Sequence, residues 1–217
     1  MEVGTTTTDA RSPLRLYRIP FSTNVERIAL ALAHKGAEVE YVEVDPDDRT
    51  PVIEISGQEL VPVLVDGDLV LSDSPAILEH LEETFPDPPL FPADTARREE
   101  LRTFLDWFNQ VWKRAPNLIA TEEQKPEPDR MRIAELEGRI AAALRRFEGL
   151  LAGRDYLFGD ELTAADVTAF PFLKYAVLWI DGDEERFHEI LRETQRLDGR
   201  YPRLEAWIHR VDALPRA

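Results

Sequence analysis

The residues best placed to do chemistry in this sequence follow a hairpin pattern within residues 60–81. Apolar residues alternate along Val61–Val65 and resume after Asp66-Gly67, as in two strands joined by a two-residue type I′ turn. Ser74 then stands where the N-cap of a helix belongs, with Pro75 at the first helical position. The hydroxyl and the free backbone N–H groups of such a helix start form a site for a carboxylate.

This stretch resembles the glutathione site of the glutathione transferase family. The resemblance implies that Pro62 is the cis-proline of thioredoxin-like folds, and that it holds Val61 for antiparallel backbone pairing with the cysteinyl unit of glutathione. Asp73 and Ser74 would receive the γ-glutamyl end. The family more often has Glu or Gln where Asp73 stands, so its reach here is shorter. The alternative is structural: Val-Pro opens an edge strand and Ser-Pro only caps a helix.

The resemblance also implies where the glutathione thiol would be activated. In the family the activating group lies at the start of the first helix, and Ser22 takes that place. We expect Thr23 and Glu26 to form a capping box, which leaves Ser22 just before the cap. Its hydroxyl would donate a hydrogen bond to the thiolate while the helix end adds positive potential. Both effects lower the pKa of the thiol.

Three alternatives to this role of Ser22 stay open. The segment Ile19-Pro-Phe-Ser22 resembles the Cys-Pro-Phe opening of cysteine-type relatives, with Ile19 in place of the reactive Cys, and this register leaves no nucleophile. Thr23 becomes the candidate hydroxyl if the helix begins one residue later. Ser22 could also be a plain turn residue before the helix.

Two further parts of a transferase site follow from the resemblance. Basic residues after the second strand usually hold the glycyl carboxylate of glutathione in this family. Arg49 is the natural candidate, because it is the only Lys or Arg between Lys35 and Arg97. A solvated loop arginine is the alternative. The electrophile pocket is expected between the domains, where three aromatic residues either line it or belong to the core: Phe21, Phe108 and Trp112.

Composition excludes several other kinds of site. The 217 residues carry 42 acidic and 26 basic side chains, and a formal charge of −16 disfavours nucleic acid and anionic membranes as partners. The chain has no cysteine, which excludes disulfides, thiolate metal sites and a cysteine nucleophile. The four histidines are scattered without ligand spacing, so we expect no metal site.

The pattern of elements predicts two domains. Strand 14–18, helix 23–35 ending at Gly36, strand 39–44, the hairpin and its helix follow the order βαβ-ββα. We therefore expect the fold class to be an α/β thioredoxin-like N-terminal domain followed by an all-α helical-bundle domain. The expected boundaries are a disordered leader at 1–13, the glutathione-binding domain at 14–84, a proline-rich linker at 85–93 and the helical domain at 94–217.

The second half of the chain continues the resemblance. Thr163-Ala-Ala-Asp166 is a capping box that follows a Gly-Asp-x-Leu segment, as in the family, and Tyr201–Trp207 resembles the family's final helix. We read the capping box as a stabilising element rather than a catalytic one.

The resemblance implies a cytoplasmic, serine-type glutathione S-transferase that conjugates glutathione, its co-substrate, to an apolar small-molecule electrophile. It also implies a homodimer. Two alternatives stay open: a non-catalytic thiol-binding or structural protein of this fold, or a transferase that uses another low-molecular-weight thiol. The ratio of 22 Arg to 4 Lys motivates the last one, because it points to a GC-rich genome. The sequence contains no apolar run of about 18 residues, the length that a membrane-spanning helix requires.

Overall fold

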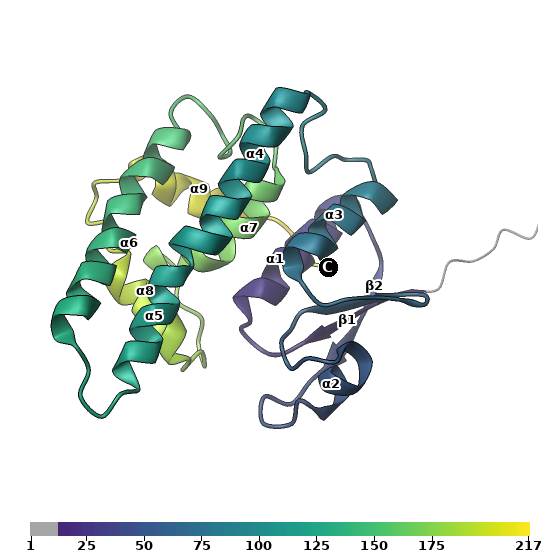
Figure 1. Cartoon of the computed structure of the whole chain (residues 1–217). Coiled ribbons are helices and arrows are strands. Elements are labelled where there is room, and N and C mark those ends of the chain that lie inside the picture. Colours follow the sequence, from purple (N-terminus) through teal and green to yellow (C-terminus); the bar gives the residue numbers. More distant parts are fainter. Residues whose placement is uncertain (1–12) are drawn as a thin grey trace, which may run out of the picture.

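The computed structural model describes residues 13–217 as a sheet with helices followed by a helical region (Figure 1). The expected leader lies, apart from Pro13, outside the described residues. The first region contains β1 (Leu14–Arg18), α1 (Thr23–Lys35), β2 (Val39–Glu43), α2 (Thr50–Ser56), β3 (Val63–Asp66), β4 (Leu69–Leu71) and α3 (Ser74–Thr84). The second contains α4 (Thr95–Trp107), the π-helical η1 (Phe108–Trp112), α5 (Arg114–Glu123), α6 (Arg130–Leu150), α7 (Ala164–Leu173), the 3-10 helix η2 (Lys174–Ala176), α8 (Arg186–Thr194) and α9 (Pro202–Asp212).

The sheet has the strand order β2-β1-β3-β4. β1 pairs in parallel with β2 and antiparallel with β3, and β3 pairs antiparallel with β4. Helices α1 and α3 cover one face of the sheet and α2 covers the other (Figure 1). A small apolar cluster fills the α2 side, with Tyr17, Val44, Val52, Val63 and Val65 at its centre. The expected fold class, a thioredoxin-like region followed by a helical one, is confirmed.

The hairpin turn lies one residue later than the sequence predicts. Asp66 pairs with Leu69 across the hairpin, so Asp66 still belongs to β3 and the turn residues are Gly67 and Asp68. Gly67 has φ +58°, a left-handed conformation in which a side chain would be strained. The prediction of Asp66-Gly67 as the turn was therefore wrong by one position, because Gly67 is the first rather than the second of the two turn residues.

The two regions share one large apolar core. Helix α1 packs against α3 in its own region and against α7 in the helical region. Glu26 on α1 adds two ion pairs, to Lys174 at 2.5 Å and to Arg216 at 3.0 Å. The backbone N–H of Ala217 also donates to the carbonyl of Ala29 at 3.1 Å. Helix α1 is therefore held from both sides, and its N-terminus has a defined place between the regions.

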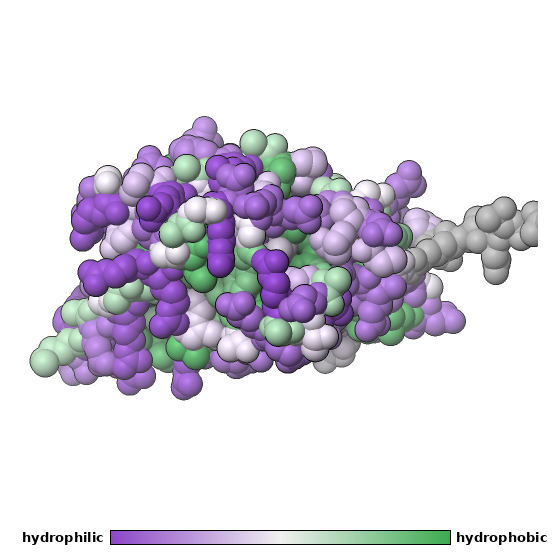
Figure 2. All heavy atoms as spheres, turned by 90° about the horizontal axis from the view of Figure 1, so that it is seen from above, coloured by the Kyte–Doolittle hydropathy of each residue, from purple (hydrophilic) through white to green (hydrophobic). Residues whose placement is uncertain are grey.

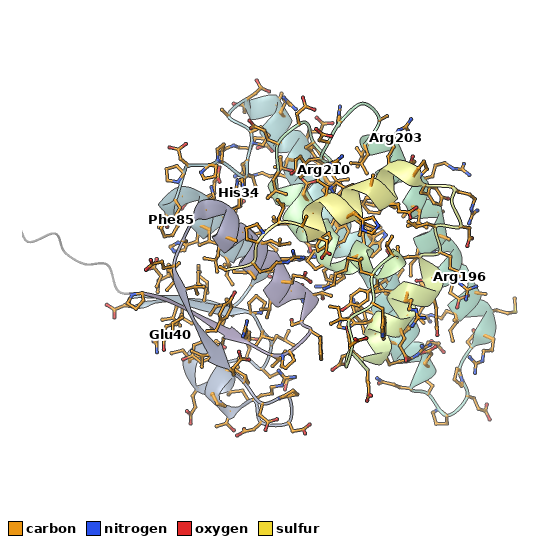
Figure 3. The ribbon with its side chains drawn as sticks, turned by 180° about the vertical axis from the view of Figure 1, so that it is seen from behind. His34, Glu40, Phe85, Arg196, Arg203 and Arg210 are labelled. Carbon is orange, nitrogen blue, oxygen red and sulfur yellow. The ribbon has the colours of Figure 1, made fainter. Side chains whose placement is uncertain are left out.

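The expected capping box at the start of α7 is present. Asp166 is fully buried, and its carboxylate accepts hydrogen bonds from the Thr163 N–H, the Thr163 hydroxyl, the Leu157 N–H and Trp207 Nε1, all at 2.8–2.9 Å. Trp207 comes from α9, which Figure 3 shows from behind with Arg203 and Arg210 labelled. One carboxylate thus joins the start of α7, the preceding loop and α9.

Hydrophilic side chains predominate on the face in Figure 2, where they surround a hollow floored by apolar residues. No helix within residues 13–217 is both long and apolar enough to cross a membrane.

Replacing Asp166 should destabilise the fold. The change Asp166→Ala leaves the Leu157 and Thr163 N–H groups and the Trp207 indole without an acceptor in a buried place. Because each unpaired buried donor costs about 1–3 kcal/mol, we expect the free energy of unfolding to fall by about 3 kcal/mol or more. Urea denaturation followed by tryptophan fluorescence measures this. The exposed Asp160 provides the control, Asp160→Ala, and equal denaturation midpoints for both variants would contradict the assignment.

Candidate active site

The chain turns sharply between β1 and α1. Phe21 has φ +59°, which is uncommon for a residue with a side chain, and it leaves 37% of its surface exposed. The next residue, Ser22, is the N-cap of α1, and its Oγ accepts a hydrogen bond from the Val25 N–H at 3.4 Å. The expected capping box of Thr23 and Glu26 was therefore wrong. Ser22 caps the helix itself, since its extended backbone (ψ 113°) ends the turn.

This geometry bears on the alternatives to Ser22. Ser22 is half-buried, and its hydroxyl proton stays free to donate while the oxygen accepts from Val25. Thr23 lies inside the first turn of α1 and is buried, with 5% of its surface exposed. Ile19 packs against the apolar cluster on the α2 side of the sheet. Ser22 is therefore the best placed of the three to meet a ligand at the start of α1.

The start of α3 also differs by one residue from the prediction. Asp73 occupies the N-cap position with an extended backbone, and Ser74 is the first helical residue. Asp73 is exposed, whereas Ser74 is buried. The predicted N-cap at Ser74 was wrong because Pro75 occupies the second position of the helix. The Ser74 hydroxyl accepts a hydrogen bond from Arg27 Nη1 at 3.2 Å, so it links α3 to α1.

The Val61–Pro62 peptide bond is cis and lies directly before β3. The pairing of β3 with β1 ends at Val63, which pairs with Tyr17, so Val61 lies outside the paired part of the sheet. Among residues 13–217, the backbone of Val61 makes no hydrogen bond to another segment. Its N–H and carbonyl groups are therefore available to an extended ligand that adds to this end of the sheet.

The sequence did not reveal the role of Arg27, which is 1% exposed and joins both regions. Its guanidinium donates to the Ser74 hydroxyl, to Asn109 Oδ1 at 2.9 Å and to the carbonyl oxygen of Thr168 at 3.0 Å. Nη2 is buried and has no partner within the described chain. Burial lowers the pKa of Arg27 to about 9, and the nearby Asp73 carboxylate opposes that shift.

Lys113 follows η1 and brings a second cation to the same place. Its Nζ donates to Asn24 Oδ1 at 2.9 Å, and Asn24 is two residues beyond Ser22 on α1. Burial lowers the pKa of Lys113 to about 7, with repulsion from Arg27 as the second cause and attraction by Asp73 opposing both. The start of α1 is therefore bounded by a half-buried ammonium group from the helical region.

Other predicted residues lie elsewhere. Phe108 and Trp112 have 0% and 4% of their surface exposed, so the structure assigns both to the core rather than to a pocket wall at the start of α1. Their rings stack on each other with centroids 4.7 Å apart. Arg49 is the half-buried residue before α2, and it makes no ion pair within residues 13–217. The structure thus brings Asp73 and Ser74 toward Arg27, and it brings Lys113 to the first turn of α1, which Ser22 caps, whereas Arg49 precedes α2 on the other face of the sheet.

Arg27 and Lys113 could have been found only in part from the sequence. Arg27 directly precedes five apolar residues of α1, Ile28 to Leu32, and a charged residue beside such a run indicates a buried partner. Lys113 carries no such signal. It lies between η1 and α5 in the other region, and only the packing of the two regions places it beside Asn24.

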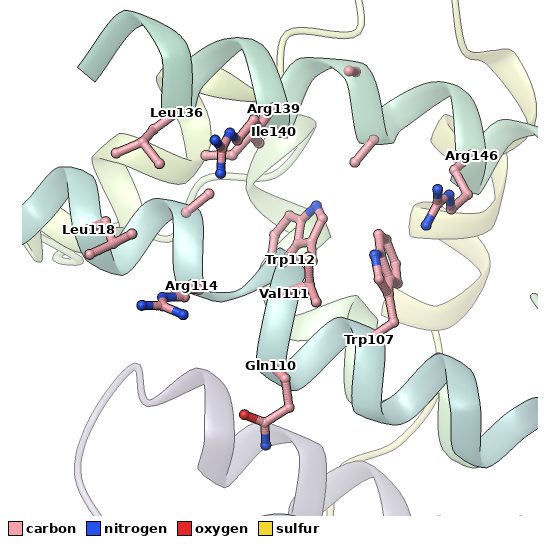
Figure 4. Close-up of a pocket in the computed structure, with 13 residues that line it drawn as sticks. Trp107, Gln110, Val111, Trp112, Arg114, Leu118, Leu136, Arg139, Ile140 and Arg146 are labelled. Atoms are coloured by element: carbon pink, nitrogen blue, oxygen red, sulfur yellow. The ribbon is translucent and has the colours of Figure 1, made fainter. Parts of the chain in front are cut away.

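The structure also contains a groove of about 600 Å³ between the η1–α5 segment and α6 (Figure 4). Trp107, Val111, Leu118 and Ile140 provide apolar walls. Neither Ser22 nor Ser74 lines it, so it is not the site at the helix starts. Three arginines lie at this groove: Arg114, Arg139 and Arg146. Within residues 13–217 no group of three or more His, Asp or Glu side chains could hold a metal ion.

The arrangement defines a class of protein: a thioredoxin-like sheet with a cis-proline and two helix starts, joined to a helical region. Comparison with known proteins agrees with this class. Residues 16–89 match the family model for the glutathione S-transferase N-terminal domain, and residues 130–210 match the model for the C-terminal domain. A zeta-class glutathione S-transferase from Euphorbia esula is 32% identical over 187 residues, covering 82% of this chain and 83% of that protein. The chain belongs to the glutathione S-transferase family.

Two other similar proteins show the range of the family. A stringent starvation protein A homolog from Coxiella burnetii is 30% identical over 165 residues, which is 75% of this chain and 76% of that protein. The crystal structure of a glutathione S-transferase from Rhodospirillum rubrum is 27% identical and has a TM-score of 0.71, covering 92% of this chain and 88% of that one. Family membership therefore does not by itself decide whether this chain is an enzyme.

Proposed function

We propose that this protein is a glutathione S-transferase in which the Ser22 hydroxyl stabilises the thiolate of bound glutathione for attack on an electrophile. The observation that carries the proposal is the place of Ser22 at the N-terminus of α1, with a hydroxyl proton that no described group accepts. A hydroxyl donor and a helix N-terminus both favour the ionised sulfur. Lowering the thiol pKa by one unit corresponds to about 1.4 kcal/mol and raises the thiolate fraction at neutral pH nearly tenfold.

The remaining residues are proposed to bind the tripeptide. Val61, before the cis-Pro62, supports backbone pairing with the cysteinyl unit, because its N–H and carbonyl groups are unpaired within the described chain. Asp73 and Ser74 are proposed to bind the γ-glutamyl end, and Arg49 the glycyl carboxylate. Glutathione must be reduced to react, so we propose a cytoplasmic location and a detoxifying conjugation.

A non-catalytic protein of the same fold is the second candidate. The similarity to a stringent starvation protein A homolog favours it, since that name describes no transferase. Retention on immobilised glutathione, combined with conjugation of 1-chloro-2,4-dinitrobenzene, separates the two candidates. Turnover supports the enzyme, and retention without turnover supports the binding protein. If the protein is neither retained nor active, another low-molecular-weight thiol becomes the candidate co-substrate.

The change Ser22→Ala should raise the pKa of bound glutathione and lower kcat. The thiolate loses its hydroxyl donor, and removal of one donor from a preorganised site costs about 2–4 kcal/mol. Thiolate absorbance measured against pH gives the pKa in parent and variant. Thr23→Ala is the matched control, because Thr23 is the next residue after Ser22 and is buried. If only Thr23→Ala raises the pKa of bound glutathione, Thr23 rather than Ser22 is the hydroxyl that stabilises the thiolate. Helix capping by Ser22 is worth about 1 kcal/mol, so folding is checked by circular dichroism.

The change Ser74→Ala should weaken glutathione binding with little effect on kcat. A contact to the γ-glutamyl end is made equally in the ground and transition states, so KM rises while turnover stays nearly constant. Steady-state kinetics with varied glutathione measure both constants. The exposed Ser72, two residues earlier, provides the control Ser72→Ala. A fall in kcat at unchanged KM would contradict the binding role.

We further propose a symmetric homodimer that packs the thioredoxin-like region of one subunit against the helical region of the other. The groove beside Val111 supports this arrangement, since Val111 leaves 59% of its surface exposed within an apolar surface. The arginines of the groove are complementary to residues 14–84, which contain 15 acidic and 5 basic side chains. The contact should be apolar at its centre and charged at its rim.

The change Val111→Glu should dissociate this dimer. Sedimentation at micromolar concentration should give a dimer for the parent protein and a species near the chain mass of 24.8 kDa for the variant. Met131 is 85% exposed and does not line the groove, so Met131→Glu should leave the dimer intact. High salt should not dissolve the parent dimer, because screening over about 8–10 Å weakens the repulsion between chains of like charge. A monomeric parent in both low and high salt would rule the dimer out.

A further inference from the structure

The four lysines of the chain differ in one respect. Three of them form ion pairs with glutamates at 2.5–2.8 Å: Lys35 with Glu82, Lys125 with Glu122 and Lys174 with Glu26. Lys113 forms no ion pair with any carboxylate of residues 13–217. This is unexpected for a chain with 42 acidic and 26 basic residues, in which a cation meets carboxylates easily. A cation kept apart from so many carboxylates is available to an external anion.

The surroundings of Lys113 make the absence of a carboxylate partner unfavourable for its ammonium group. Its Nζ lies 5.2 Å from the ring centroid of Phe172, and the Arg27 guanidinium lies 4.7 Å from the same centroid. Two cations thus share one buried ring, and Arg27 Nη2 has no partner. The nearby carboxylate, Asp73, is exposed and forms an ion pair with neither of them. Because a poorly solvated charge without a counter-ion is unfavourable, the place attracts an anion.

The anion is not expected to be a carboxylate of glutathione. The start of α3, with Asp73 and Ser74, is the proposed place of the γ-glutamyl end, and Arg49 before α2 is the candidate for the glycyl end. Lys113 comes instead from the helical region. It reaches the first turn of α1 through Asn24, close to Ser22. The proposed contacts of glutathione all come from residues 14–84, so a group bound by Lys113 would lie on the side of the helical region.

Two aromatic side chains of neighbouring loops are partly exposed. Phe21, directly before Ser22, and Trp179, between η2 and α8, leave 37% and 38% of their surfaces exposed. The loop that carries Trp179 reaches Phe21, since a Cβ at Gly182 would lie 4.0 Å from Phe21 Cζ. Trp179 also has the Arg192 guanidinium 4.8 Å from its ring centroid, so the Phe21 ring, next to Ser22, is the one that offers contact area to a flat apolar group at the start of α1.

We propose that the second substrate of this transferase is an electrophile with an anionic group, a carboxylate or its equivalent, on an aromatic body, and that Lys113 binds the anionic group. This inference rests on the proposed function and replaces a purely apolar electrophile by an acidic one. For the probe 4-chloro-3-nitrobenzoate, the glutathione sulfur forms a bond to the carbon that bears chlorine. The carbon–chlorine bond breaks, chloride leaves with the bonding electrons, and the thiol proton passes to solvent.

Binding of two matched products tests the proposal without requiring turnover. The probes are S-(4-carboxy-2-nitrophenyl)glutathione and its 4-carbamoyl analogue, which differ in the charge of one group. Calorimetry should show the carboxylate bound about ten- to a hundredfold more tightly, the range for a hydrogen bond to a charged group. Lys113→Met should abolish this preference and Lys113→Arg should keep most of it. The control Lys125→Met, at a surface lysine paired with Glu122, should leave the preference unchanged.

The pH dependence of the preference for the carboxylate product provides a second test. Lys113 is charged below its pKa of about 7 and loses its proton above it, whereas the aryl carboxylate is ionised throughout. The preference should therefore decrease from pH 6 to pH 8.5. Arg27 on α1 and Asp73 before α3 are the charged groups that face Lys113, and both are present in the parent and in Lys113→Met, so an effect that they cause would remain in the variant. The decrease should be absent in Lys113→Met.

Each other outcome overturns the inference. Equal binding of the two products, with 1-chloro-2,4-dinitrobenzene still conjugated, contradicts the acidic substrate and leaves the proposed function standing. Weaker binding of glutathione itself to Lys113→Met assigns the lysine to glutathione instead. If neither product nor glutathione binds, the proposed function and this inference fail together. Lys113→Met should fold normally, since it removes a poorly solvated charge, and its thermal unfolding is measured alongside.

Discussion

The buried guanidinium of Arg27 is the interaction on which the arrangement of the two regions depends. It starts on α1 and donates to a hydroxyl of α3, a side chain of η1 and a backbone carbonyl of α7. A guanidinium suits this place because its planar fork holds several donors in fixed directions and stays charged when buried. Arg27 thus links α1 directly to the Ser74 hydroxyl at the start of α3.

The same place collects positive potential in a chain that is strongly negative elsewhere. The N-termini of α1 and α3, Arg27 and Lys113 all contribute, and Asp73 is the acidic group that balances them. Such a site suits a reaction whose attacking species is a thiolate. It also explains how a chain of charge −16 could bind a tripeptide with two carboxylates, since the local potential rather than the net charge acts on a bound ligand.

Much of the fold could be predicted because its signals are local. Strand 14–18 and helix 23–35 have the predicted bounds, since alternation defines the strand and Gly36, at φ +60°, ends the helix. The capping box of Asp166 was equally readable. The errors at the hairpin turn and at the N-caps of α1 and α3 are shifts of one residue. Neighbouring Asp, Ser, Thr and Gly suit caps and turns almost equally, so local preference does not choose between them.

The sequence by itself determined the family, the order of elements and the candidate residues Ser22, Asp73 and Ser74, because these lie in short segments with characteristic spacing. Only the tertiary structure decided that Phe108 and Trp112 belong to the core and that Arg27 and Lys113 meet beside the helix starts. Arg27 and Lys113 are 86 positions apart in the chain. Their proximity follows from packing α1 against the helical region, and burial and charge repulsion, which shift their pKa values, exist only once that packing is complete.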